Sequence, residues 1–315
     1  MGRYAIGVDV GGTTVKLGLF TGEGELISKW EIPTRTENGG ENILPDIAAS
    51  IDEKLAESGI DKKEVTGCGI GVPGPVDSAG VVRRAVNLGW DFFNLEEKAT
   101  QLFGMHVYGG NDANVAALGE AWKGAAAGYS TSVMVTLGTG IGGGVIINGR
   151  IMTGVTGAGG EIGHIHVNDE ETIPCNCGNC GCIEQYASAT GIARLARERL
   201  EKNDDASSLR GIEEVTAKDV FDAVKAGDKV AIEIAERFGK YLGDTLAAIA
   251  CVINPDVIVL GGGVSKAGDI LIGFVEKNFT KNVFHASRGT KFVIASLGND
   301  AGIYGGARMA INGIG

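Results

Sequence analysis

The stretch Tyr4–Phe20, YAIGVDVGGTTVKLGLF, decides the fold class of this 315-residue chain. Tyr4–Val10 is an apolar run rich in β-branched residues, Gly11-Gly12 interrupts it, and Thr14–Phe20 resumes it. This pattern predicts two strands joined by a tight turn. A third apolar run follows after a second glycine-containing turn, so the chain is expected to open with three consecutive strands.

The second half of the chain repeats this arrangement. Ser132–Leu137 is an apolar run, Gly138-Thr139-Gly140 breaks it, and Gly144–Ile147 resumes it. Strands alternating with helices follow each hairpin. The repetition indicates an internal duplication, and the alternation predicts two α/β lobes with a ligand-binding cleft between them.

Composition excludes several classes of protein. The net charge of −11 without a Lys/Arg-rich tract opposes nucleic-acid binding as the main function. No run approaches the roughly 20 apolar residues that span a bilayer, and the N-terminus enters a strand and not a signal sequence. We therefore expect a cytoplasmic protein with no membrane partner.

The glycine turns carry the pieces of a nucleotide site. Asp9 ends a strand, Gly11 and Gly12 allow backbone amides to face an anion, and Lys16 follows in the next strand. Such an arrangement suits phosphates held with Mg²⁺. The alternative is an ordinary hairpin turn with an exposed aspartate.

Two further glycine-rich segments extend this hypothesis. The turn at 137–144 occupies the equivalent place in the second half, and Gly261–Gly263 follows a strand where an adenosine would fit, although a plain loop is an equal alternative. A dinucleotide fold is disfavoured because the first glycines join two strands and do not open a helix. The residues expected to bind ATP and Mg²⁺ are Asp9, Gly11, Gly12, Thr13, Thr14, Lys16, Gly138, Thr139, Gly140, Gly262 and Gly263.

The order of motifs along the chain resembles the ROK family of sugar kinases, most closely its bacterial glucokinases. The resemblance is carried by Asp9–Lys16, Asn111-Asp112-Ala113-Asn114, the turn at 137–144, GEIGH at 160–164, and CxCGxxGCxE at 175–184. It covers essentially the whole chain. It implies an enzyme, and the absence of a winged-helix segment before Asp9 separates the chain from the family's repressors.

The resemblance also implies the architecture. The expected fold is the two-lobed actin-like ATPase fold, which is ribonuclease H-like. Residues 1–110 would form a small lobe onto which a C-terminal helix at about 299–315 packs back, and residues 111–298 would form a large lobe with the zinc block.

By the same resemblance, Asp112 is the catalytic base that takes the proton of a sugar hydroxyl. The sugar-binding positions that match the family are Gly74, Asn87, Asn111, Asp112, Glu161, His164 and Glu184. From the residues alone, Asp112 could equally be a helix N-cap, and Gly74 a turn glycine between two prolines. If Asp112 is the base, Asn114 is left for capping.

Four of the six cysteines lie within eight residues, which favours a metal site in a reducing compartment over a disulfide framework. His164 with Cys175, Cys177 and Cys182 offers the ligand set of a closed structural zinc site. The second ring nitrogen of His164 would then be left for a sugar hydroxyl. Cys180 or His166 as a replacement ligand, a disulfide, free thiols and a Cys177–Cys180 redox pair remain as alternatives.

The expected function is transfer of the γ-phosphate of ATP to the 6-hydroxyl of glucose, with Mg²⁺ and a structural Zn²⁺. Alternatives within this chemistry are mannose, fructose, N-acetylglucosamine or N-acetylmannosamine as acceptor. A non-catalytic sugar sensor and an actin-like filament or chaperone ATPase are alternatives of other classes. A homodimer, or a tetramer, is expected by analogy alone.

Overall fold

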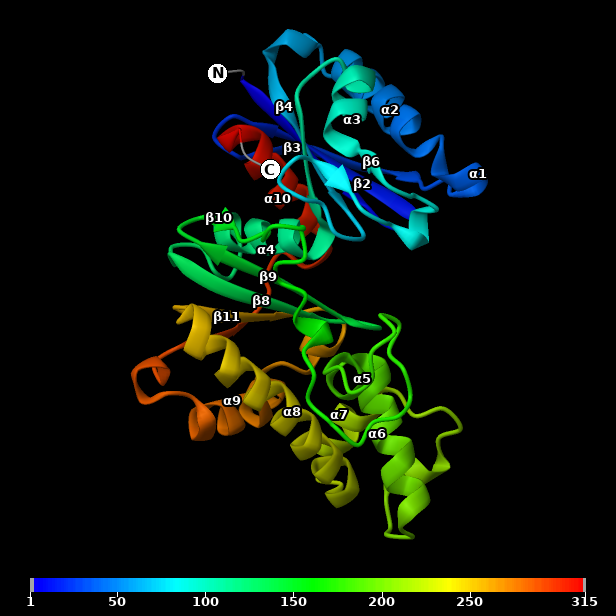
Figure 1. Cartoon of the computed structure of the whole chain (residues 1–315), viewed down its shortest axis with the longest axis vertical. Helices are drawn as coiled ribbons and strands as arrows, with labels where there is room; N and C mark the ends of the chain where they lie inside the picture. The colour runs from blue at the N-terminus through cyan, green and yellow to red at the C-terminus, as the bar shows by residue number, and fades with distance from the viewer. Residues whose placement is uncertain (1–2, 314–315) are drawn as a thin grey trace. The chain divides into compact units, whose positions relative to one another are not determined.

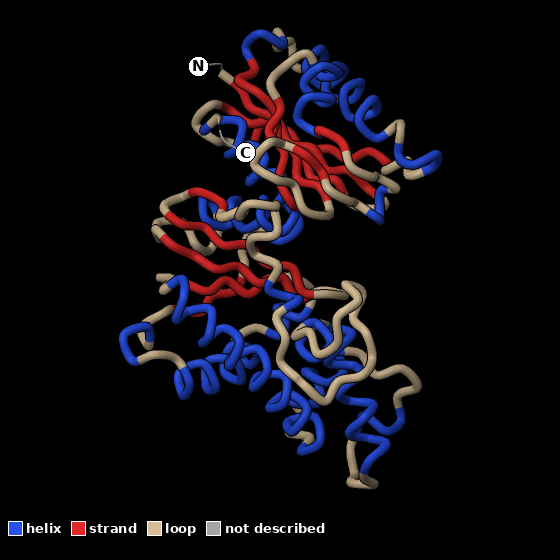
Figure 2. The backbone as a smooth tube through the Cα atoms, in the orientation of Figure 1, coloured by secondary structure: helices blue, strands red, loops and turns tan. Residues whose placement is uncertain are grey.

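The computed structural model describes residues 3–313 and divides into two compact α/β units (Figures 1 and 2). Unit 1 comprises the chain up to Ser130, Gly144–Gly160, and the chain from Ser296 on. Unit 2 comprises Thr131–Gly143 and Glu161–Ala295. The expected lobe boundaries at 110/111 and 298/299 stay predictions. Each helix within residues 3–313 is too short or too polar to cross a bilayer.

The first sheet belongs to unit 1 and has the order β3-β2-β1-β4-β7. Its strands are β1 (Tyr4–Val10), β2 (Thr14–Thr21), β3 (Leu26–Pro33), β4 (Val65–Val72) and β7 (Val107–Asn111). The first three strands are antiparallel neighbours, whereas β4 and β7 run parallel to β1. In the β1–β2 register Asp9 pairs with Lys16, so both lie beside the turn that joins the two strands.

Helices cover both faces of this sheet, as the buried parallel strands require. The helices of unit 1 are α1 (Glu37–Gly40), α2 (Ile43–Glu57), α3 (Leu95–Phe103), α4 (Asp112–Lys123) and α10 (Ala301–Asn312). Two short strands, β5 (Val81–Val82) and β6 (Phe93–Asn94), form a separate pair. Ile6, Val8 and Leu17 share one core with α2 and α3. Because side chains alternate along a strand, Gly7 and Asp9 face the other way, toward α10.

Helix α10 lies unusually close to the sheet because glycines remove the side chains between them. A Cβ on Gly7 would lie 1.8 Å from the carbonyl oxygen of Ile303, and one on Gly69 would lie 2.0 Å from that of Gly306. These glycines therefore have a packing role, and the start of α10 is held against the strand that carries Asp9.

The second sheet has the order β10-β9-β8-β11-β12. Its strands are β8 (Thr131–Leu137), β9 (Ile141–Ile147), β10 (Arg150–Ile151), β11 (Val257–Gly261) and β12 (Lys291–Ile294). The helices of unit 2 are α5 (Glu184–Ala187), α6 (Ala189–Lys202), α7 (Ala217–Lys225), α8 (Lys229–Ile253) and α9 (Asp269–Asn282). β11 pairs in parallel with both β8 and β12.

The two sheets match strand for strand. In each, three strands joined by tight turns are followed, on the far side of the first strand, by two parallel strands. In each, a glycine turn joins the first strand to the second. The internal duplication expected from the repeated glycine hairpins is therefore present in the fold.

Candidate active site and metal centre

The turn between β1 and β2 presents backbone at the end of the first hairpin. The amide of Gly11 donates to the carbonyl of Thr14 (3.0 Å), and the Thr34 hydroxyl donates to the carbonyl of Gly11 (2.7 Å). Gly12 and Thr13 are exposed at the tip. This shape suits an anion contacted by backbone amides.

Asp9 lies beside this turn in a largely buried position. Burial, and after it the negative charge of Asp112, raise the pKa of Asp9 to about 6 against the opposing effect of Lys16. Gly302, at the start of α10, comes so near that a Cβ there would lie 2.6 Å from the Asp9 carboxyl carbon. Unit 1 therefore holds two carboxylates whose mutual repulsion a cation would relieve.

Asp112 is the first residue of α4, and its neighbour Asn111 is the N-cap. The Asn111 side-chain oxygen accepts from the amide of Asn114 (3.2 Å), while its side-chain nitrogen donates to the carbonyl of Gly74 (3.3 Å). The interpretations of Asp112 or Asn114 as the cap are therefore wrong. The N-cap of α4 is Asn111, which the family resemblance assigns to sugar binding.

Asn114 is buried instead and ties a loop to α4. Its side-chain nitrogen donates to the carbonyl of Gly159 (3.0 Å), and its side-chain oxygen is buried without a hydrogen-bond partner among the described residues. A buried polar atom without a hydrogen-bond partner lowers the stability of the fold unless a water or a ligand forms a hydrogen bond with it.

Gly74 and Asn87 occupy other turns of unit 1. Gly74 has φ +105°, and a Cβ there would lie 2.3 Å from the carbonyl oxygen of Arg84. The turn itself therefore requires glycine at this position. Asn87 is exposed, and its Cβ lies 3.9 Å from where a Cβ on Gly12 would be. Their contact with sugar stays a prediction.

The turn after β8 is held from several sides within unit 2. The carbonyls of Gly138 and Thr139 accept from the Ala189 amide (2.8 Å) and the Thr190 hydroxyl (2.7 Å). The amide of Ile141 donates to a carboxylate oxygen of Glu184 (2.9 Å). The structure thus brings together the second glycine turn and Glu184, which the family resemblance assigned to sugar.

The third glycine segment borders a cavity of about 480 Å³. Gly262 has φ +82°, and a Cβ on it would lie 2.5 Å from the carbonyl oxygen of Leu137, so close strand approach requires glycine. The cavity is lined by Ala189, Thr216, Ala217, Lys218, Phe221, Asp222, Lys225, Gly263, Val264, Lys266 and Ala267. An aromatic ring, apolar walls and three lysines suit a base attached to phosphates.

Among the residues that line this cavity, the sequence predicts only Gly263 as a contact for ATP. Lys218, Phe221 and Lys225 lie on the amphipathic helix α7, and Lys266 lies in the turn after Gly263. On their own they look like ordinary surface residues with one core aromatic. Only their convergence with the glycine segment marks them as a binding surface.

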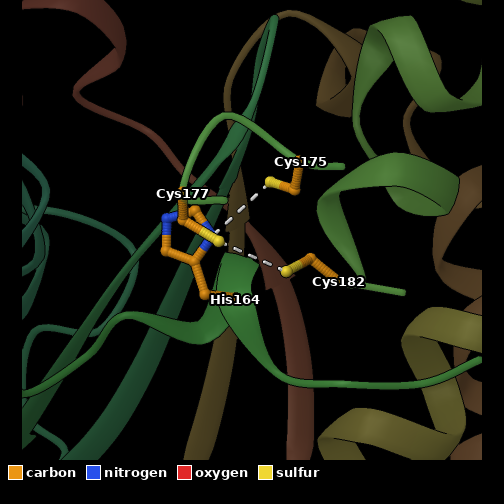
Figure 3. A group of neighbouring side chains, drawn as sticks. All are labelled: His164, Cys175, Cys177 and Cys182. Atoms are coloured by element: carbon orange, nitrogen blue, oxygen red, sulfur yellow. Dashed lines mark hydrogen bonds between the residues drawn. The ribbon is translucent and has the colours of Figure 1, made fainter. Parts of the chain in front are cut away.

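The side chains of His164, Cys175, Cys177 and Cys182 converge on one point of unit 2 (Figure 3). The four ligand atoms all lie within 4.8 Å of one another. The Cys175 sulfur is 3.8 Å from Nδ1 of His164, and the sulfurs of Cys177 and Cys182 are 3.6 Å apart. Three thiols and an imidazole in this arrangement form a group that could hold a metal ion, and this donor set is the one that zinc prefers.

The alternatives to this ligand set lose support. All six cysteines are free, and a sulfur separation of 3.6 Å exceeds the roughly 2.05 Å of a disulfide. His166 instead contacts the carbonyl of Cys180 (2.9 Å) and the carboxylate of Asp169 (2.8 Å). Neither His166 nor Cys180 belongs to the converging group.

The outer nitrogen of His164 faces a carboxylate. Nε2 lies 3.8 Å from Oε2 of Glu161, and both side chains are about one-third exposed. Glu161 also directly precedes the short 3₁₀ turn Ile162–His164. Burial, with a smaller contribution from the nearby Glu184 carboxylate, raises the pKa of the Cys175 thiol to about 12. The raised pKa favours the protonated thiol. A bound dication would favour the thiolate instead.

Two α/β sheets of matching order, each with a glycine turn after its first strand, define a protein of the actin-like ATPase fold. The comparisons with known proteins narrow this class. The ROK family profile matches residues 5–312, and the chain therefore belongs to the ROK family.

Three similar proteins match this chain over nearly their full length. The glucokinase of Halalkalibacterium halodurans is 45% identical over 309 residues, which cover 96% of this chain and 94% of that protein. The ROK hexokinase from Thermus thermophilus has a TM-score of 0.81 and 32% identity, with 96% of both chains covered. A ROK family glucokinase from Streptomyces griseus, solved with glucose and AMPPNP, has a TM-score of 0.76 and 33% identity over 98% of this chain and 99% of that one.

Proposed function

We propose that this protein is an ATP-dependent glucokinase that transfers the γ-phosphate of ATP to the 6-hydroxyl of glucose. The observation that carries the proposal is the 45% identity to a glucokinase over nearly the whole of both chains. The glucose and AMPPNP held by the similar Streptomyces griseus enzyme support the two substrates.

We assign ATP to the glycine turns and the cavity beside α7. Phe221 and the apolar walls would contact the base, and Lys218 and Lys266 offer positive charge for phosphates. The glycine turns at 11–14 in unit 1 and at 138–140 in unit 2 are each proposed to contact phosphate. A cavity of about 480 Å³ is within the usual range for such ligands.

Asp112 is the proposed catalytic base. It would accept the proton of the 6-hydroxyl as that oxygen forms a bond to the γ-phosphorus and the bond from phosphorus to the β–γ bridging oxygen breaks, which releases ADP. Asp9 and its neighbours would hold Mg²⁺, which neutralises phosphate charge when bound. The residues proposed to contact glucose are Gly74, Asn87, Asn111, Asp112, Glu161, His164 and Glu184.

Zn²⁺ is the proposed occupant of the group His164, Cys175, Cys177 and Cys182. When bound, it would cross-link four residues of the segment 164–182 without taking part in the transfer. The proposed location is the cytoplasm, where free clustered thiols persist. Assembly into a homodimer stays a prediction from the family resemblance, which analytical ultracentrifugation tests.

The experiment that tests the function is a coupled ADP-release assay with ATP and Mg²⁺ against five sugars and a no-sugar control. The sugars are glucose, mannose, fructose, N-acetylglucosamine and N-acetylmannosamine. Glucose should give the highest kcat/KM. Preference for another sugar would change the acceptor while keeping the reaction. ADP release in the absence of sugar, or no ADP release with any of the five sugars, would overturn the proposal.

A further inference from the structure

We propose that Glu184 is a positioning residue for the nucleotide, because it holds the glycine turn at 138–141 in the shape that receives phosphate. This inference rests on the proposed function, but it concerns a second role for a residue otherwise assigned to sugar. It can be tested in the absence of sugar.

Direct contact joins Glu184 to the turn. Oε2 of Glu184 accepts from the amide of Ile141 at 2.9 Å, and a Cβ on Gly140 would lie only 2.1 Å from the same oxygen. The carboxylate therefore occupies the space that any other residue at 140 would need. The absence of a side chain at Gly140 allows Glu184 to reach the backbone.

Residues that follow Glu184 complete the support. Ala189 and Thr190 hold the carbonyls of Gly138 and Thr139, so three contacts from residues 184–190 fix the turn. The amides of a phosphate-binding turn must be aimed before the ligand arrives, because ordering them on binding would cost affinity. Glu184 fixes the end of the turn where β9 begins.

The other oxygen of Glu184 faces the metal centre. Oε1 lies 3.3 Å from the sulfur of Cys175, and Cys182 is only two residues away in the chain. The carboxylate thus touches both the cysteine group and the glycine turn. Its orientation is determined by the fold of segment 164–182 as well as by the turn.

The test measures binding of AMPPNP with Mg²⁺ to sugar-free protein by calorimetry. Glu184→Ala should weaken this binding by roughly tenfold, since a hydrogen bond to a charged group is lost. Glu184→Gln keeps an acceptor for the Ile141 amide and should retain most of the affinity. Glu170→Ala, which removes an exposed carboxylate of the segment 164–182, is the matched control and should bind normally.

Gly140→Ala provides an independent route to the same state, because its methyl group would displace the flexible end of Glu184. It should weaken AMPPNP binding about as much as Glu184→Ala. In the Glu184→Ala background it should add little, because the contact is already lost. The control Gly273→Ala places a methyl on the exposed face of α9, where nothing lies within 4 Å.

Zinc content and melting temperature are measured for every variant to separate positioning from unfolding. Normal AMPPNP affinity in folded Glu184→Ala would overturn the proposal, as would a full additional loss from Gly140→Ala in that background. If wild-type protein binds AMPPNP but phosphorylates no sugar, the proposed function fails while the role of Glu184 stands.

Discussion

Single residues of this protein carry roles that their immediate neighbours in sequence do not reveal. Asn111 and Asp112 are adjacent, yet the first caps α4 and contacts Gly74, while the second lies beside Asp9 and raises its pKa. The two residues differ in role because of helix geometry, since the side chain of the N-cap residue turns back toward the first amides of the helix. Asp112 is therefore not required to begin the helix.

Asp112→Asn should abolish phosphoryl transfer and leave the fold intact. We expect kcat to fall by about 10²- to 10⁴-fold, because the amide cannot accept the hydroxyl proton, while glucose affinity by calorimetry changes little. Asp269→Asn is a matched control, since Asp269 is exposed and is likewise the first residue of a helix, α9. Retention of turnover by Asp112→Asn would remove the assignment.

Glu120→Ala should destabilise the protein through three backbone amides. Glu120 is fully buried in α4 and accepts from the amides of Ala125 (2.7 Å), Leu297 (2.8 Å) and Ser296 (3.2 Å). Its loss leaves these donors without a partner, at a cost of about 2–4 kcal/mol in the free energy of unfolding. Urea denaturation measures the change, and exposed Glu53→Ala should be near neutral.

At the scale of elements, the hairpins and long helices follow from local patterns, whereas irregular segments depend on capping and on side-chain contacts. The helix expected at about 229–252 is α8, Lys229–Ile253, which begins after the cap Asp228 and ends at Asn254 in the left-handed conformation. The segment 164–182 has little regular structure, so its shape depends on side-chain contacts.

Asp228→Ala should weaken both the start of α8 and the loop packed against it. One oxygen of Asp228 accepts from the Ala231 amide (3.1 Å), and the other from the Ser208 amide (2.7 Å) and two serine hydroxyls. We expect a loss of about 1–2 kcal/mol in the free energy of unfolding. Asp204→Ala, in the exposed loop before Ser207, should have no comparable effect in the same denaturation experiment.

If the proposed zinc is bound, its removal should loosen the segment 164–182. A strong chelator is expected to lower the melting temperature by at least about 5 °C, because metal binding energy is folding energy in such sites. Cys177→Ser should lower the zinc content measured by atomic absorption, whereas Cys251→Ser, at an exposed cysteine far along the chain, should not. Equal zinc in both variants would contradict the assigned ligands.

At the scale of the whole molecule, acid should destabilise the protein through carboxylates that are ionised in the fold. Burial alone would raise the pKa of Glu171, but hydrogen bonds from Tyr186 (2.6 Å) and the Ile173 amide (2.9 Å), and a salt bridge with Arg194, lower it to about 2. Burial also opposes ionisation of Asp228, yet its hydrogen bonds lower that pKa to about 2.

The sign of this effect follows from linkage. Both groups have lower pKa values in the fold than their ordinary 4.5 and 3.8, so their stabilisation is present above those values and is lost as the pH falls toward 2. The melting temperature should therefore fall steadily from about pH 5 to pH 3. Glu171→Gln should be less stable at neutral pH and should lose part of this dependence; an unchanged slope would exclude Glu171 as a contributor.

The sequence by itself determined the glycine hairpins, their duplication, and the set of cysteines and histidine that the structure gathers. These features depend on strand periodicity, turn chemistry and short spacing, which are local properties of a chain. The tertiary structure alone decided that Lys218 and Lys266 share a cavity with Gly263, that Asn111 contacts the carbonyl of Gly74, and that Glu184 touches the second glycine turn. Those contacts join segments up to several tens of residues apart, so they arise from packing, which no local pattern encodes.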